Sequence, residues 1–160
     1  MNNSFERSKN TTIEWYTPKY IIEALGDDFD LDPCAPYNNW YTAKKSYTKE
    51  DNGLLKEWFG RVFLNPPYTN PIVKEFVTRL ADHGDGIALL YARVDNKMFH
   101  EQIFNRATSI KFLCNRIKFI RQDGEVGKSP GCGSVLVAYG KDCDNILKNC
   151  PLKGKYIKLI

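Results

Sequence analysis

The tetrapeptide Asn65-Pro66-Pro67-Tyr68 is the sequence feature that most constrains the fold of this chain. Proline fixes its own φ and pushes the residue before it toward extended backbone, so Asn65 and Pro66 are both held straight. The apolar run 61–64 precedes the tetrapeptide, and Asn70-Pro71 after it has the pattern of a helix start. We therefore predict a strand, a rigid turn and a helix, with the tetrapeptide at the carboxyl end of the strand.

The same four residues carry the groups that activate an amine bonded to a planar ring. The Asn65 side-chain oxygen and the Pro66 backbone carbonyl can each accept a hydrogen from the amine, while Tyr68 offers an aromatic face to the ring. Two acceptors draw the delocalised nitrogen toward the tetrahedral geometry of a nucleophile. A purely structural turn is the alternative, but the flanking strand and helix favour a catalytic site made of Asn65, Pro66, Pro67 and Tyr68.

The apolar pattern of the whole chain alternates between strands and helices. We predict helices over 18–24, 71–80 and 95–105, the first with Thr17 as its N-cap and the last with Asp95 as its N-cap. We predict strands over 29–31, 45–47, 61–64, 86–91, 109–113, 116–120 and 134–139. This alternation indicates an α/β fold with a doubly wound sheet and helices on both faces. Ligands of such sheets bind outside the carboxyl ends of the strands, where Asp32 and Asn65 would both lie.

Composition limits the kind of protein this can be. A chain of 160 residues supports one folded domain, which we assign to residues 13–160, after a flexible polar arm over 1–12. Five cysteines without C-x-x-C spacing argue against a disulfide framework and a zinc ribbon, and His83 and His100 are not spaced as metal ligands. No apolar run is long enough to span a membrane. We expect a cytoplasmic protein with no metal and no membrane association.

Charge is unevenly distributed along the chain, whose formal net charge is +4. Residues 1–109 hold 13 basic and 15 acidic side chains, whereas residues 110–160 hold 10 basic and 4 acidic ones. A basic C-terminal third suggests a face that meets phosphates. A lysine-rich surface that is merely solvated is the alternative.

Four segments in a fixed order carry a resemblance to a known family. Glu14–Pro18, Asp30–Ala35, Thr48–Leu54 and Trp58–Tyr68 resemble the phage-type, Dam-like DNA N6-adenine methyltransferases, and 90–95, 98–100, 116–119 and 134–140 are similar as well. The resemblance implies a Rossmann-like methyltransferase sheet that uses S-adenosylmethionine and methylates the exocyclic amine of adenine in DNA. It also implies a bacterial cell, the host of a phage or prophage.

The resemblance further implies which residues hold the cofactor. Trp15, Tyr16, Thr17 and Pro18 are similar to the N-terminal cofactor motif, in which the threonine and nearby amides hold the methionine carboxylate; a helix N-terminus suits that anion. Asp32, Pro33, Cys34 and Ala35 resemble the loop that lines the cofactor, with Asp32 accepting from the methionine ammonium or a ribose hydroxyl. Asp51 resembles the acidic position that contacts the cofactor adenine; a plain turn at Asp51-Asn52-Gly53 is the alternative. The chain departs from the glycine-rich version of this loop, since Pro33-Cys34-Ala35-Pro36 stands where G-x-G-x-x-G would.

The DNA-facing residues are predicted from chemistry. An enzyme that methylates a base in duplex DNA must extrude it and hold it by stacking. We assign stacking to Tyr68 and a second wall to Phe119, for which a place in the core is the alternative. Five basic residues are candidate phosphate contacts, namely Arg93, Arg116, Lys118, Arg121 and Lys128.

Three other functions fit parts of this pattern. N4-cytosine methylation needs the same two acceptors, and glutamine methylation of a protein shares the tetrapeptide. The basic C-terminal third disfavours a protein substrate. A DNA-binding module that keeps the fold without turnover is the alternative outside enzyme chemistry.

Overall fold

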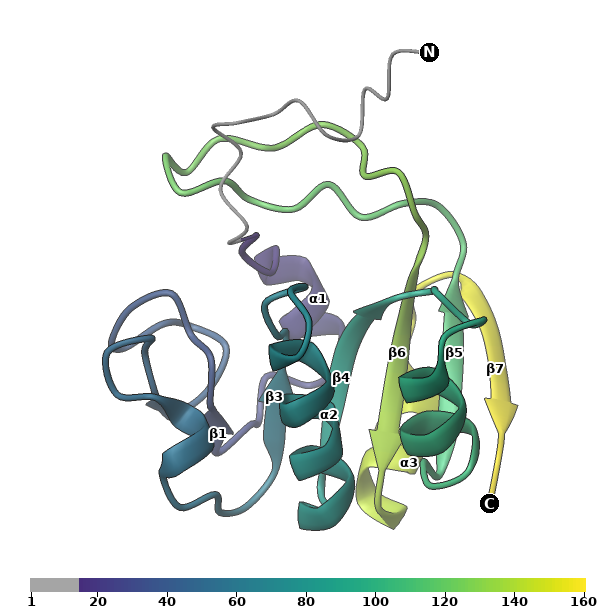
Figure 1. Ribbon diagram of the computed structural model, residues 1–160. Helices are drawn as coiled ribbons and strands as arrows, with labels where there is room; N and C mark the ends of the chain where they lie inside the picture. The colour runs from purple at the N-terminus through teal and green to yellow at the C-terminus, as the bar shows by residue number, and fades with distance from the viewer. Residues whose placement is uncertain (1–14) are drawn as a thin grey trace, which may run out of the picture.

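The computed structural model describes residues 15–160, and seven strands of this segment form one sheet (Figure 1). Their order across the sheet is β2-β1-β3-β4-β6-β5-β7. The strands are β1 (Leu31–Asp32), β2 (Lys45–Ser46), β3 (Val62–Leu64), β4 (Gly86–Tyr91), β5 (Ser109–Leu113), β6 (Ser134–Tyr139) and β7 (Gly154–Lys158). The arm predicted over residues 1–12 lies outside the described residues.

Five strands point in one direction and two run against them. The pairs β2·β1, β1·β3 and β3·β4 are parallel, whereas β6 is antiparallel to both β4 and β5, and β7 is antiparallel to β5. The sheet is therefore mixed, and β6 interrupts what would otherwise be a parallel array. The carboxyl ends of β1, β3, β4 and β5 meet at one edge, where the long connection 114–133 leaves the sheet (Figure 1).

Helices cover both faces of the sheet, as predicted. α2 (Ile72–His83) and the π-helix η2 (Phe99–Phe104) pack in one core, and α1 (Lys19–Ala24) and α3 (Lys141–Asn149) pack in the other. Strand β4 contributes side chains to both cores. Ala88 and Leu90 pack in the core with α2, and Ile87 and Leu89 pack in the core with α1 and α3. Burial on two faces explains the unbroken apolar run of this strand.

Helix α2 follows the tetrapeptide and fixes the direction of the chain behind it. Its buried stripe consists of Val73, Phe76, Val77 and Leu80. The helix extends beyond the predicted end at Leu80 to His83, and Gly84 ends it with a φ of 77° while its N–H donates to the Leu80 carbonyl.

Most predicted strands are present with small shifts at their ends. Strands 86–91, 109–113 and 134–139 are confirmed as β4, β5 and β6, and β2 and β3 are each one residue shorter than predicted. The strand predicted over 29–31 is displaced to Leu31–Asp32. The Asp30 carboxylate accepts the Arg61 N–H at 2.8 Å, so the regular pairing of β1 begins only after it.

The strand predicted over 116–120 is wrong. Ile117 and Phe119 are buried in the core shared with α1 and α3, and Ile120 forms isolated bridges with Tyr16 and Val126 outside the sheet. The alternation of apolar residues is real, but it reflects packing onto a core from one side. Such packing has the same period of two as a strand.

Three helical or strand segments differ from or add to the prediction. The helix expected from Asp95 begins after Asn96, whose side chain accepts the Phe99 N–H at 2.8 Å, and it continues as η2. Helix α3 and strand β7 carry no prediction, since α3 buries few residues and β7 is an edge strand with mostly exposed side chains. Within residues 15–160, no helix is long and apolar enough to cross a membrane.

Candidate active site

A cavity of about 450 Å³ lies at the carboxyl-end edge of β1 and β3. Because these two strands are neighbours, the loops that follow them converge there. The cavity is lined by all four predicted catalytic residues and by every predicted cofactor residue except Pro18 and Asp51. Its other walls are formed by Trp40, the turn 48–54 and the first turns of α2.

Asn65 is held with its carboxamide in a defined orientation. Its Nδ2 donates to the Trp15 carbonyl and to the Thr17 hydroxyl, both at 3.0 Å. A carbonyl can only accept, so the group facing Trp15 must be the NH2 of the amide. Both nitrogen-bound hydrogens are thereby used, and among the described residues no donor reaches Oδ1. The side chain therefore presents a free acceptor, as activation of an amine requires.

The two prolines make the strand end a row of acceptors. Pro66 and Pro67 both line the cavity, and because proline has no N–H, the backbone of each offers only a carbonyl acceptor. Within residues 15–160, no donor is bonded to the Pro66 carbonyl. The Asn65 carbonyl, in contrast, accepts a hydrogen bond from the Cys34 thiol at 3.4 Å, which ties the loop after β1 to the end of β3.

Tyr68 is fixed at both its hydroxyl and its ring. The hydroxyl donates to the Leu89 carbonyl at 2.9 Å, and the ring packs on Tyr91 at a centroid distance of 4.1 Å and an angle of 32°. Burial and the neighbouring Tyr91 hold the pKa of Tyr68 well above its usual value, so the hydroxyl stays protonated as a donor. The ring is thus a rigid wall of the cavity.

Asp32 is a buried carboxylate at the cavity wall. It is 3% exposed, accepts from the Cys34 N–H at 3.0 Å and from the Thr42 hydroxyl, and burial raises its pKa to about 6. No Lys or Arg of residues 15–160 pairs with it. A buried carboxylate without a cation is unfavourable by itself, so this position is suited to a ligand that brings a positive charge or a donor.

Thr17 has a different role from the predicted helix cap. Helix α1 has Pro18 at its N-cap and no side-chain cap, and it is only six residues long. The Thr17 hydroxyl instead faces Asn65, while its carbonyl accepts from the Tyr41 hydroxyl. Thr17 is 2% exposed. The predicted N-cap at Thr17 is therefore wrong, and segment 15–17 is a cavity wall in which the Trp15 carbonyl and the Thr17 hydroxyl face Asn65.

An aromatic cluster that the sequence analysis missed frames one side of the cavity. Trp40, a lining residue, lies 5.4 Å from Tyr16, 4.8 Å from Tyr37 and 4.1 Å from Tyr41, measured between ring centroids. The available signal was the density of aromatic residues in 37–41, close behind the Asp32 loop. Thr42, the partner of Asp32, follows in the same stretch.

The turn 48–54 approaches the Asp32 loop through its backbone. Asp51 shapes the turn by accepting from the Thr48 N–H at 2.8 Å and from the Thr48 hydroxyl at 3.1 Å. It does not line the cavity; Thr48, Lys49, Asn52 and Gly53 do. A Cβ on Gly53 would lie 2.0 Å from the Pro33 carbonyl oxygen, so glycine is required for this close approach, which sequence reasoning missed.

The predicted DNA contacts lie outside the cavity, at the same edge of the sheet. Arg93 follows β4 and stands 5.8 Å over the Tyr91 ring, and the other basic residues are exposed on segment 114–133, namely Arg116, Lys118, Arg121 and Lys128. Phe119 is 3% exposed and packs beneath Tyr91. With so little surface it has no face left for a base, and the core alternative describes its position.

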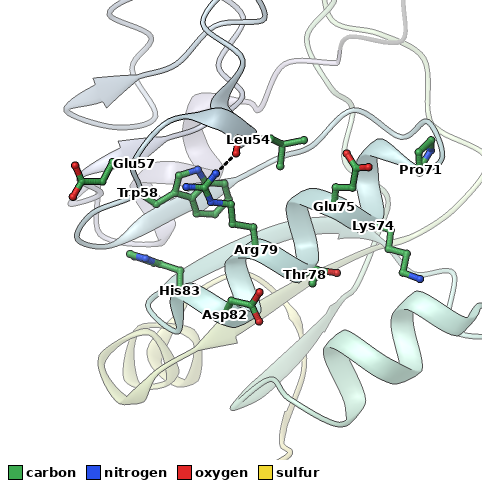
Figure 2. A pocket seen from close by; sticks show the side chains of 10 residues that line it. All are labelled: Leu54, Glu57, Trp58, Pro71, Lys74, Glu75, Thr78, Arg79, Asp82 and His83. Carbon is green, nitrogen blue, oxygen red and sulfur yellow. Dashed lines mark hydrogen bonds between the residues drawn. The ribbon is translucent and has the colours of Figure 1, made fainter.

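A second, wider depression of about 850 Å³ lies on the outer face of α2 (Figure 2). There Arg79 donates to the Leu54 and Lys56 carbonyls and lies 5.0 Å over the Trp58 ring, which fastens the helix to the turn 53–58. Although it is larger than the cavity, it contains none of the predicted site residues. Within residues 15–160, no group of three His, Cys, Asp or Glu side chains is placed to hold a metal ion.

Comparison with known protein families gives a match over most of the chain. The family model described as DNA N-6-adenine-methyltransferase (Dam) matches residues 6–142, which include every residue of the cavity wall. Searches of the curated proteins and of the solved structures give no match. The family match covers most of the chain and confirms the resemblance on which the sequence analysis relied. The chain belongs to the DNA N-6-adenine-methyltransferase (Dam) family.

Proposed function

We propose that this protein transfers a methyl group from S-adenosylmethionine to the exocyclic N6 amine of adenine in DNA, on a Rossmann-like sheet formed by a single methyltransferase domain over residues 13–160. The observation that carries the proposal is the orientation of Asn65. Its amide nitrogen is bound to segment 15–17, so its oxygen is left as an acceptor beside the Pro66 carbonyl in a cavity. Family membership supports adenine as the base.

The charge and the lining of the cavity support S-adenosylmethionine as the cofactor. Asp32 is buried without a cation among the described residues, and it would accept from the methionine ammonium or a ribose hydroxyl. Trp40, Pro33 and Cys34 supply apolar and aromatic walls. S-adenosylmethionine supplies an electrophilic methyl group, whose bond to sulfur breaks as its bond to the amine nitrogen forms.

The residues of the chain prepare the amine and hold the base. Asn65 Oδ1 and the Pro66 carbonyl accept the two hydrogens of N6, which localises its lone pair. Tyr68, pinned by its hydroxyl to Leu89, offers a fixed ring against which the adenine stacks. No strong general base is required, because the proton of the alkylated nitrogen is very acidic and passes to water or a hydrogen-bonded acceptor.

The basic residues at the same edge are proposed to contact the DNA backbone. Arg93 and the exposed basic residues of segment 114–133 lie on the loops that follow β4 and β5. These loops border the edge at which the cavity opens. Phosphate contacts there would position the duplex without reading its sequence.

Nucleoside analysis tests this function directly. Unmethylated DNA is incubated with protein and S-adenosylmethionine, digested, and examined by mass spectrometry for N6-methyldeoxyadenosine. The Asn65→Ala variant serves as the control, with an expected rate loss of about 10²- to 10³-fold and cofactor affinity within a few-fold of the wild type. Asn65→Ala with full activity would contradict the mechanism.

Two other outcomes of the same experiment have defined meanings. N4-methyldeoxycytidine as the main product would keep the Asn65 chemistry and overturn the choice of adenine, since both amines fit two acceptors. Cofactor binding and DNA binding without any methylated nucleoside would favour the non-catalytic module.

A further inference from the structure

We propose that Thr17 is a positioning residue that locks the Asn65 carboxamide with its oxygen available to the amine. This inference rests on the proposed function and assigns a role to the N-terminal motif within the chemical step. It starts from the hydrogen bond of 3.0 Å between Asn65 Nδ2 and Thr17 Oγ1.

The two partners of Asn65 contribute differently. The Trp15 carbonyl, also at 3.0 Å, can only accept and therefore selects the orientation in which nitrogen faces segment 15–17. One such bond leaves the amide free to swing about its terminal torsion, which is broad for Asn. The Thr17 hydroxyl holds the second hydrogen and fixes the plane. Together they form a fork that leaves Oδ1 pointing away from the segment.

Thr17 is itself held rigidly enough for this task. It is 2% exposed, and its carbonyl accepts from the Tyr41 hydroxyl. The preceding residue, Tyr16, exchanges backbone hydrogen bonds with Ile120 at 2.8 Å and 3.0 Å. A branched side chain on such a fixed backbone has few rotamers available, so its hydroxyl is preorganised toward Asn65.

The Thr17 hydroxyl faces Asn65 and does not cap a helix. α1 has only six residues and no side-chain cap, so Thr17 does not stand at a capped helix N-terminus. Its oxygen already accepts a hydrogen from Asn65. This bond uses only the acceptor capacity of the hydroxyl, so the orienting role does not depend on what the hydroxyl hydrogen binds.

The test separates chemistry from cofactor binding. Thr17→Val keeps the shape and removes the acceptor; single-turnover methyl transfer is measured at saturating DNA and cofactor, and cofactor affinity by titration calorimetry. The transfer rate is expected to fall about tenfold, the scale of one lost hydrogen bond, with cofactor affinity within threefold of the wild type. Thr17→Ser should restore the rate because it keeps the oxygen.

A matched control exists at the opposite edge of the sheet. The Thr108 hydroxyl, just before β5, accepts from the Gly140 N–H at 3.0 Å, the same length as the bond between Asn65 and Thr17. Thr108→Val therefore removes a comparable hydrogen bond. It should leave the transfer rate and the cofactor affinity unchanged. If Thr17→Val does not fold, the transfer rate and the cofactor affinity of Thr17→Ala are compared with those of Thr17→Ser. In an Asn65→Ala background, the Thr17 change should have no further effect on the rate.

Each opposite result overturns the inference. A tenfold or greater loss of cofactor affinity with an unchanged rate at saturation would make Thr17 a cofactor ligand, and unchanged rate and affinity would make it structural. Wild-type protein that forms no N6-methyldeoxyadenosine in this assay would overturn the proposed function and this role with it. A failure of the inference alone is recognised by an active wild type.

Discussion

Ile120 and Tyr16 are joined by backbone hydrogen bonds in both directions, at 2.8 Å and 3.0 Å. Tyr16 lies between the two residues that hold Asn65, and Ile120 lies between the exposed basic residues Lys118 and Arg121. The segment proposed to meet DNA is therefore bonded directly to the segment that orients the Asn65 amide, for which we propose a catalytic role. The proposed DNA-contacting residues thus lie next to the proposed active site in the structure.

Tyr68 gives a prediction that distinguishes stacking from hydroxyl chemistry. Tyr68→Phe loses the bond to the Leu89 carbonyl, so the free energy of unfolding should fall by about 1 kcal/mol while the transfer rate stays within a few-fold. Tyr68→Ala removes the wall that packs on Tyr91 and should abolish most transfer. Single-turnover rates and urea unfolding of both variants measure this; equal damage to transfer by both changes would assign the role to the hydroxyl.

The ionised Asp32 carboxylate should lower the free energy of unfolding of the protein while serving cofactor binding. Its pKa is raised by burial to about 6, above the value in the unfolded chain, so its contribution to stability is present below pH 4 and is lost as the pH rises through 6. Asp32→Asn should therefore raise the free energy of unfolding at pH 8 by about 1 to 3 kcal/mol. It should also flatten the pH dependence between 4 and 6. Urea unfolding at several pH values measures this.

The same substitution should weaken the cofactor site. Loss of a charge-assisted hydrogen bond is worth about 1.5 to 3 kcal/mol, so S-adenosylmethionine affinity should fall at least tenfold in Asp32→Asn. In the wild type, affinity should decline as the pH drops below 6, because the carboxylate becomes protonated. Calorimetric titrations without added metal test both statements. Unchanged affinity in a folded Asp32→Asn protein would remove Asp32 from the cofactor site.

Gly53 should be intolerant of a side chain. A Cβ there would stand 2.0 Å from the Pro33 carbonyl oxygen, a backbone atom that cannot move without shifting the Asp32 loop. Gly53→Ala is expected to lower cofactor affinity about tenfold or more and to lower the midpoint of urea unfolding. Gly133→Ala is the control, since no atom lies within 4 Å of its Cβ position. Equal cofactor affinity in the two variants would argue against this backbone contact.

The basic segment predicts a steep salt dependence of DNA affinity. If about four to six phosphates are neutralised, log K against log salt should have a slope of about −4 to −5 on duplex DNA. Lys118 and Lys128 are exposed, and replacing both with Ala should make the slope shallower by about 2. Fluorescence anisotropy at several salt concentrations measures it. A flat dependence in the wild type would show that the segment is only solvated surface.

Much of the site could be predicted because it depends on local patterns. Asp32 and Asn65 follow apolar runs that become the neighbouring parallel strands β1 and β3, so their meeting in one cavity follows from the α/β pattern. The rigidity of the tetrapeptide is likewise a property of its own two prolines.

The features that escaped prediction depend on contacts between distant segments. Nothing near Thr42 indicates that it bonds to Asp32, and the bridge from Ile120 to Tyr16 joins two loops without a shared sequence signal. The reversal of β6 between β4 and β5 is also a property of the whole sheet. Phe119 illustrates the ambiguity, because an aromatic residue in an alternating run serves a core or a ligand equally well.

The connection 114–133 begins and ends on strands that are paired with each other, β5 and β6. A loop between adjacent paired strands can change without changing the order of the sheet. In this loop, however, Ile117 and Phe119 are buried in the core, and Gly127 lies close to Trp15 of the cavity wall. The part of the chain proposed to touch DNA is therefore exchangeable at its exposed positions only, with its register set by the contact of Ile120 with Tyr16. We expect substitutions at those positions to change how firmly the DNA backbone is held while leaving the proposed chemical centre unaltered.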